Sequence, residues 1–302
     1  MYLLVALVGY FLLAGAQILD KFILEKSVPR PLLLTFYSTI FLLPLIWVAP
    51  FLPIPNSAGF LVAIISAFAF SAALYAMYRG FFISEVSHMG PFIGAIIPVF
   101  VLLLNFWFVK ETISQMSLVG VALLVVGSFI MCFEFSQVNK SGLHWGILWG
   151  ILSAFLFAIS HVAAKLLYVQ VGFASGLVWS RGLMGVVGIL LLFTPIVRKT
   201  LFDFSKKQNS HKNSSLRQVA LVGTNKALGA VGELLIQYSI AIGSVVVVSA
   251  MAGSQYALLV IGVALFTRFA PRWFKEVYFR KEIYQEVIGI LFIAAGLALL
   301  IL

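Results

Sequence analysis

The chain has 302 residues, of which 62% are hydrophobic and only 10% are charged. A water-soluble domain carries roughly 45–50% apolar and about 25% charged residues, so this composition excludes a soluble globular protein. The formal net charge of +10 comes mainly from basic residues between apolar segments. That placement indicates membrane topology and contacts with anionic lipids, and it argues against a nucleic-acid partner.

Apolar segments recur along the whole chain at the length that an α-helix needs to cross about 30 Å of hydrocarbon. No alternation of period two appears, which argues against a transmembrane barrel. The first segment lacks a basic leader and a cleavage site, so we expect it to be retained. We expect an all-α polytopic membrane protein with ten transmembrane helices. The expected spans cover residues 2–20, 32–52, 58–80, 86–109, 115–133, 144–167, 175–197, 217–241, 244–267 and 284–302.

Three segments of the first half of the chain recur in the second half in the same order. Residues 11–21 (FLLAGAQILDK) align without a gap with residues 155–165 (FLFAISHVAAK). A tyrosine-bearing segment before a short loop occurs twice, and so does a Lys-Glu pair followed by two glycines. We therefore expect a duplication, with a first five-helix repeat over residues 1–137 and a second over residues 142–302.

An odd number of spans in each repeat has a geometric consequence. The second repeat must enter the membrane from the side opposite to the first, so the two repeats are expected to be inverted. Many secondary transporters place their substrate site near the membrane midplane, between two such repeats.

Lysine and arginine residues lie mainly in the connections after the odd-numbered spans, whereas Lys110 and Lys165 lie toward the other face. Basic residues favour the cytoplasmic side of a membrane. The charge distribution therefore predicts that both termini lie outside the cytoplasm.

Nearly the whole chain resembles the drug/metabolite transporter superfamily, and within it the EamA-type family. The resemblance implies two five-helix repeats and the transport of small metabolites or drugs. It also implies cytoplasmic termini, against the charge distribution. The matching residues are Lys110-Glu111-Thr112, Gly120 and Gly127 in the first repeat, and Lys281-Glu282, Gly289 and Gly296 in the second.

Catalytic and metal-binding patterns are missing from the sequence. The four histidines have no metal-ligand spacing, and no phosphate-binding loop is present. The single cysteine, Cys132, excludes an internal disulfide and a cysteine-based metal site. We therefore expect a protein that is not an enzyme and that needs no cofactor.

Ionisable residues inside the expected spans are candidate substrate-binding residues, because a charge in hydrocarbon is costly. Lys226, Glu233 and Gln237 fall on one stripe of the eighth span. We expect Glu233 to pair with Arg181 or with Lys226 at a central cavity. The alternative is a structural salt bridge between packed helices. We expect Lys165 to extend to the membrane interface.

Aromatic, amide and histidine side chains complete the candidate substrate site. They would give an amphipathic wall with adaptable hydrogen bonding, although each also fits ordinary helix packing. Gln17 and His161 occupy equivalent positions of the two repeats. The candidate substrate-binding residues are Glu233, Arg181, Lys226, Gln237, Tyr78, Tyr75, Trp179, Gln17, His161, Gln255 and Tyr256.

These features favour a secondary-active or facilitative transporter that moves a small organic metabolite or drug by alternating access. Its expected location is a bacterial-type cytoplasmic membrane. Its partners would be a small-molecule substrate, membrane lipids and, where transport is coupled, a proton or ion; the chain would be a monomer or homodimer. Basic residues outnumber acidic ones in the second half, which favours a carboxylate or phosphate substrate, or a zwitterion. The alternative function is a lipid-handling protein, such as a flippase or lipid-group transferase.

Overall fold

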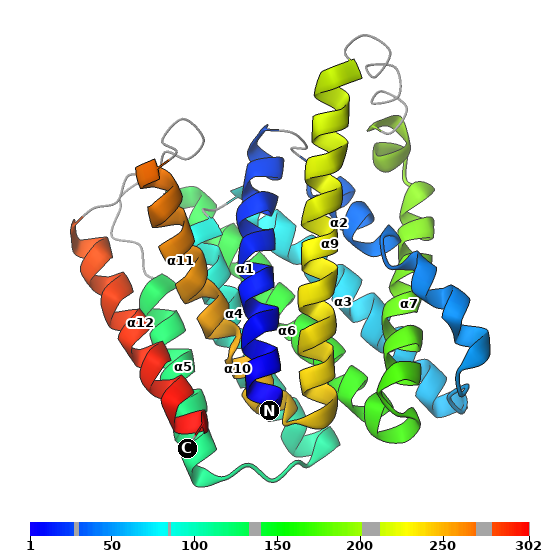
Figure 1. The fold of residues 1–302 in the computed structure, drawn as a ribbon, viewed down its shortest axis with the longest axis horizontal. Helices are drawn as coiled ribbons and strands as arrows, with labels where there is room; N and C mark the ends of the chain where they lie inside the picture. The colour runs from blue at the N-terminus through cyan, green and yellow to red at the C-terminus, as the bar shows by residue number, and fades with distance from the viewer. Residues whose placement is uncertain (27–29, 84–85, 133–139, 201–211, 270–279, 302) are drawn as a thin grey trace.

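The computed structural model describes residues 1–26, 30–83, 86–132, 140–200, 212–269 and 280–301. Over these residues the chain forms helices and no strands. Figure 1 shows the helices side by side in one bundle, with the N- and C-termini at the same end. Eight helical segments of the described chain are long and apolar enough to cross a membrane. The prediction of an all-α polytopic membrane protein is confirmed.

The helices of the first half precede the connection at residues 133–139, and those of the second half follow it. A further helical segment covers residues 195–200. The described elements are α1 (Tyr2–Lys26), α2 (Pro31–Ile40), η1 (Leu43–Phe51), α3 (Ser57–Ile83), α4 (Val86–Leu104), η2 (Asn105–Val109), α5 (Gln115–Cys132), α6 (Lys140–Val171), α7 (Phe173–Leu192), α9 (Lys212–Ile242), α10 (Val245–Ala250), α11 (Ala252–Phe269) and α12 (Arg280–Ile301).

The eight candidate spans coincide with the first seven predicted spans and with the last one. The eighth predicted span lies within α9, whose apolar sequence is interrupted by Asn225, Lys226, Glu233 and Gln237. The ninth corresponds to α10 and α11, where residues 245–259 form a shorter apolar stretch. Ten spans in two inverted repeats therefore stay a prediction.

Two of the predicted spans are not single α-helices. The second divides into α2 and a 3-10 helix, η1, which contains Pro44 and Pro50. Proline has no backbone N–H and collides with the preceding turn, so a regular α-helix does not continue here. The ninth divides at Met251, between α10 and α11. By contrast, α4 runs past Pro91 and Pro98 and continues into a π-helical turn, η2.

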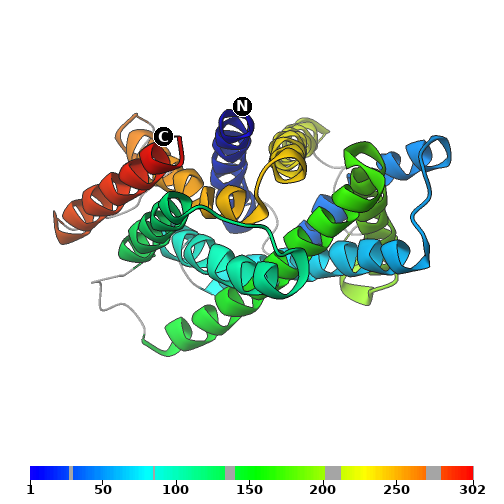
Figure 2. The same cartoon turned by 90° about the horizontal axis from the view of Figure 1, so that it is seen from below.

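Glycines bring two pairs of helices into backbone contact. A Cβ atom placed on Gly9 of α1 would lie 2.9 Å from the carbonyl oxygen of Gly232 in α9. A Cβ atom on Gly127 of α5 would lie 2.8 Å from the carbonyl oxygen of Gly289 in α12. Small residues permit this close approach, which supplies van der Waals packing between helices in lipid. Figure 2 places α5 and α12 at one side of the bundle and α7 at the other.

The Gly127→Leu variant is expected to destabilise the α5–α12 pair, because the new side chain must push the two backbones apart. Overpacking of this kind costs about 1–3 kcal/mol. Thermal unfolding of the purified protein in detergent measures the effect. Gly223→Leu is the matched control, because a Cβ atom at Gly223 has nothing within 4 Å. Equal melting temperatures for the two variants would show that the α5–α12 contact is loose.

Candidate functional site

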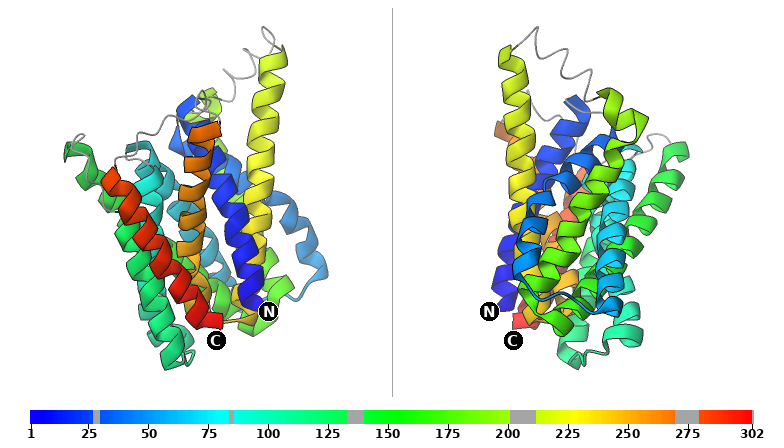
Figure 3. Two further views of the ribbon diagram at one scale, coloured as in Figure 1. Left: turned by 60° about the vertical axis from the view of Figure 1, so that its left-hand side comes forward. Right: turned by 90° about the vertical axis from the view of Figure 1, so that its right-hand side faces the viewer.

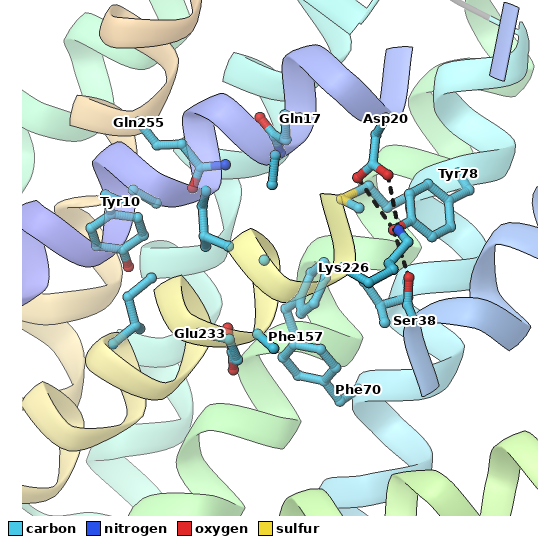
Figure 4. Close-up of a pocket in the computed structure, with 18 of the residues that line it drawn as sticks. Tyr10, Gln17, Asp20, Ser38, Phe70, Tyr78, Phe157, Lys226, Glu233 and Gln255 are labelled. Carbon is cyan, nitrogen blue, oxygen red and sulfur yellow. Dashed lines mark hydrogen bonds and ion pairs between the residues drawn. The ribbon is translucent and has the colours of Figure 1, made fainter. Parts of the chain in front are cut away.

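A cavity of about 160 Å³ lies inside the bundle and is lined by both halves of the chain. Apolar and aromatic side chains form most of its wall. Figure 4 shows Asp20, Ser38, Tyr78 and Lys226 together at one end, with Glu233 farther along α9. Seven of the predicted candidate residues line this cavity: Gln17, Tyr78, His161, Lys226, Glu233, Gln255 and Tyr256.

Asp20 organises the polar end of the cavity. Its Oδ1 atom accepts hydrogen bonds from Lys226 Nζ at 2.9 Å and from Asn225 Nδ2 at 2.6 Å. The Tyr78 hydroxyl lies 3.4 Å from Asp20 Oδ2 and 3.0 Å from the Ser38 hydroxyl. All the charge on Lys226 is therefore matched by a carboxylate within the same cluster, and the ammonium also donates to Tyr78 at 3.3 Å.

Of the two partners predicted for Glu233, Lys226 is not the one that binds it, because Lys226 pairs with Asp20. Seven residues separate Lys226 from Glu233 on one helix, which corresponds to about 10 Å along its axis. That distance is too long for an ion pair, so each residue finds a partner on another helix. The sequence reasoning missed Asp20 because it lies at the end of the first predicted span. Its position in an otherwise apolar helix was the available signal.

Glu233 is the centre of a second charge cluster inside the bundle, where its side chain is 16% exposed. Its Oε1 atom accepts hydrogen bonds from Arg181 Nη2 at 3.1 Å and from Gln237 Nε2 at 2.7 Å. The predicted Glu233–Arg181 pair is therefore confirmed. The Gln237 Oε1 atom in turn accepts a hydrogen bond from the Tyr168 hydroxyl at 2.8 Å, which joins α9 to α6.

Arg181 supports Glu233 from behind the cavity wall. Only 2% of its surface is exposed, and it does not line the cavity. Its Nη1 atom lies within 3.3 Å of the hydroxyls of Ser66 and Ser160, and its guanidinium stacks 4.3 Å from the centre of the Phe70 ring. Arg181 is thus a positioning residue, and so is the fully buried Gln237.

Two predicted candidates lie away from the cavity. Tyr75 packs edge-on against Trp149, with 5.9 Å between ring centres. Trp179 packs against Phe60 and donates a hydrogen bond to the Pro53 carbonyl oxygen at 3.3 Å. Neither residue lines the cavity. Their binding role stays a prediction, and in this structure both rings serve helix packing.

The prediction that Lys165 extends to the interface is also wrong. Lys165 is 8% exposed, and its ammonium lies 3.0 Å from Glu111 Oε1. It also donates to the carbonyl oxygens of Ile240 at 3.0 Å and Gly243 at 2.7 Å, at the end of α9. Glu111 Oε2 accepts the backbone N–H of Val245 at the start of α10. The Lys165 cation thus lies at the C-terminal end of α9 and the Glu111 carboxylate at the N-terminal end of α10, and helix dipoles favour these signs of charge at these ends.

No family model matches the chain, and no curated protein sequence matches it. The fold is similar to that of 26 chains in solved structures. One of these crystal structures aligns over 99% of this chain and 94% of its own, with a TM-score of 0.62 and 15% sequence identity. At this identity the similarity shows a shared fold alone.

The Lys165→Met variant is expected to lose about 3–5 kcal/mol of stability, because it leaves the Glu111 carboxylate without its cation. Thermal unfolding in detergent measures the loss, and adding Glu111→Gln should restore part of it. Lys110→Met is the control, because Lys110 is the residue before Glu111 and its side chain is exposed. If Lys165→Met and Lys110→Met unfold at the same temperature, the ion pair contributes nothing to stability.

Proposed function

We propose that the protein is a secondary-active or facilitative transporter that moves a small organic molecule by alternating access between two inverted five-helix repeats. The observation that carries this proposal is the cavity, because both halves of the chain supply its polar groups. Tyr10, Gln17 and Asp20 come from α1, whereas Lys226 and Glu233 come from α9. A site shared by two halves changes its access when the halves move relative to each other.

The helix pairing supports an inverted duplication. We match the helical segments of the two repeats in chain order, first with first and third with third. On this scheme α1 corresponds to α6, and α3 corresponds to α9. The observed pairing of α1 with α9 then corresponds to the pairing of α3 with α6. The last helices of the two repeats, α5 and α12, correspond to each other and also pack together. Gly120 lies beside Gly296, and Gly127 lies beside Gly289. A twofold relation between the halves explains both observations.

The course of the chain supports ten crossings. Figure 3 shows α9 and α11 running along the bundle beside α1, and both termini at one end. An even number of crossings returns the chain to the side of the membrane on which it began. The proposal therefore counts α9 and the divided α10–α11 segment as spans, in a bacterial-type cytoplasmic membrane. The four polar residues named above, Asn225, Lys226, Glu233 and Gln237, face the cavity or bond a partner within the bundle, so lipid is not their solvent.

Contacts at the end of the bundle that holds the termini support a closed gate there. The Lys165–Glu111 pair ties α6 to the segment between η2 and α5 and to the α9–α10 turn. The Tyr10 hydroxyl donates to the Val248 carbonyl oxygen at 2.8 Å, which ties α1 to α10. The Tyr2 ring lies against Gly243 in the same region. These contacts join the two halves, and a rocking motion would have to break them to open this end.

Alternating access is testable with a cysteine at Ala252, a buried residue of the cavity wall, in a Cys132→Ser background. A membrane-impermeant maleimide should label this cysteine from both sides of oriented vesicles, at different rates. Adding Glu111→Gln weakens the closed end, so it should raise labelling from the side of the termini and lower labelling from the other side. A static scaffold would instead be labelled from one side only, at a rate that Glu111→Gln does not change, and this result would contradict alternating access.

A further inference from the structure

The cavity contains buried polar atoms that the protein itself does not satisfy. Over the described residues, Gln17 Oε1, His161 Nδ1, Asn225 Oδ1 and Ser249 Oγ are buried without a hydrogen-bond partner. All four residues line the same cavity and are more than nine-tenths buried. Buried polar groups in folded proteins nearly always have a partner. Their position around one cavity therefore indicates a place for a polar ligand.

All four open positions can accept a hydrogen bond, and the two amide oxygens can only accept. The orientation of the Asn225 amide is fixed, because its Nδ2 atom donates to Asp20 and its Oδ1 atom must point elsewhere. Glu233 uses one oxygen, Oε1, for both of its hydrogen bonds. Its Oε2 atom has no donor within the described part of the chain, and Glu233 lines the cavity. Acceptors of this kind bind a ligand that brings N–H donors.

The cations near the cavity are already occupied. Lys226 is held by the Asp20 carboxylate, and Arg181 is held by Glu233 behind the wall. An anionic ligand would have to separate one of these buried pairs, which leaves an uncompensated charge at high cost. A carboxylate or phosphate substrate, which the count of basic residues favoured, does not suit this arrangement.

The remaining wall suits an apolar body on the ligand. The side chains of Tyr10, Phe157 and Tyr256 line the cavity, and their ring faces attract cations as well as apolar groups. Gly229 and Ala230 of α9 leave space between the two charged clusters, since a Cβ atom on Gly229 would only touch Ala16, at 3.8 Å. The cavity is smaller than the roughly 300–1,000 Å³ of drug-sized pockets, which favours a single-ring or short-chain molecule.

We propose that this cavity binds a small organic cation, a protonated amine on an apolar or aromatic body, with the ammonium group at Glu233 Oε2. The inference rests on the proposed transport function and specifies its substrate class. The ammonium donates to Glu233 Oε2. Arg181 holds Glu233 in place by bonding the other oxygen, so the carboxylate is oriented before the ligand arrives.

The binding test uses three probes that share a phenylethyl body and differ in the head group: 2-phenylethylamine, 2-phenylethanol and 3-phenylpropanoate. A ligand that binds the folded state raises the apparent stability by an amount that grows with the logarithm of its concentration relative to its Kd. In thermal unfolding of the purified protein, the amine should raise the melting temperature, and its apparent affinity should exceed those of the alcohol and the carboxylate at least tenfold. Stabilisation by the carboxylate alone, or equal effects of all three probes, overturns the proposal.

Two variants locate the bound amine. Glu233→Gln keeps the size of the side chain and removes its charge, so it should weaken amine binding at least tenfold while leaving the weak alcohol binding unchanged. Gly229→Leu keeps the residues of both ion pairs and fills the space between the two clusters, so it should abolish binding of the amine. Gly223→Leu, on the same helix but away from the cavity, should bind the amine like the wild type. Undiminished amine binding by Gly229→Leu overturns the proposal even if Glu233→Gln does not fold.

Uptake by proteoliposomes separates this inference from the proposed function. Labelled 2-phenylethylamine should enter vesicles with the wild-type protein and not with Gly229→Leu. If the amine binds but is not taken up, the ligand class stands and the transport function fails. If the carboxylate or L-phenylalanine is taken up and the amine neither binds nor competes, transport stands and the inference of an organic cation fails.

Discussion

Most of this structure follows from one constraint: a charge inside a membrane bundle needs an opposite charge or a wet cavity. Three ion pairs meet that need over the described residues, and each one joins different helices. Asp20–Lys226 ties α1 to α9, Arg181–Glu233 ties α7 to α9, and Lys165–Glu111 ties α6 to the segment after η2. Hydrophobic burial does not drive helices together in lipid. These pairs and the glycine contacts therefore define which helices are neighbours.

The same constraint explains why α9 is the least apolar of the long helices. It supplies a cation to one cluster and a carboxylate to the other, about 10 Å apart along its axis. Each charge is satisfied by a residue of a different helix, so the small residues between them can leave an open space. The cavity lies between the two clusters, and its wall carries buried acceptors that have no partner within the described residues.

Sequence reasoning located the helices better than it located their contacts. Hydropathy places eight of the spans because lipid imposes a length and a composition on each of them. Helical spacing placed Lys226, Glu233 and Gln237 on one face, but it could not say which helix that face meets. For the same reason it did not show that Tyr75 packs on Trp149 and Trp179 on Phe60, away from the cavity. Lys165 was misassigned because a lysine near the end of a span extends to water in many helices, and only the fold brings Glu111 and three carbonyl oxygens to it.

The three ion pairs differ in how they would respond to relative movement of the halves. Arg181 and Glu233 belong to the second half, so a rigid movement of that half carries the pair along unchanged. Asp20–Lys226 and Glu111–Lys165 each join the first half to the second, so the same movement strains them. In the proposed cycle the pair within one half therefore keeps the binding carboxylate oriented, and the two pairs between the halves change. The stability of the closed form and the preparation of the binding site thus depend on different residues.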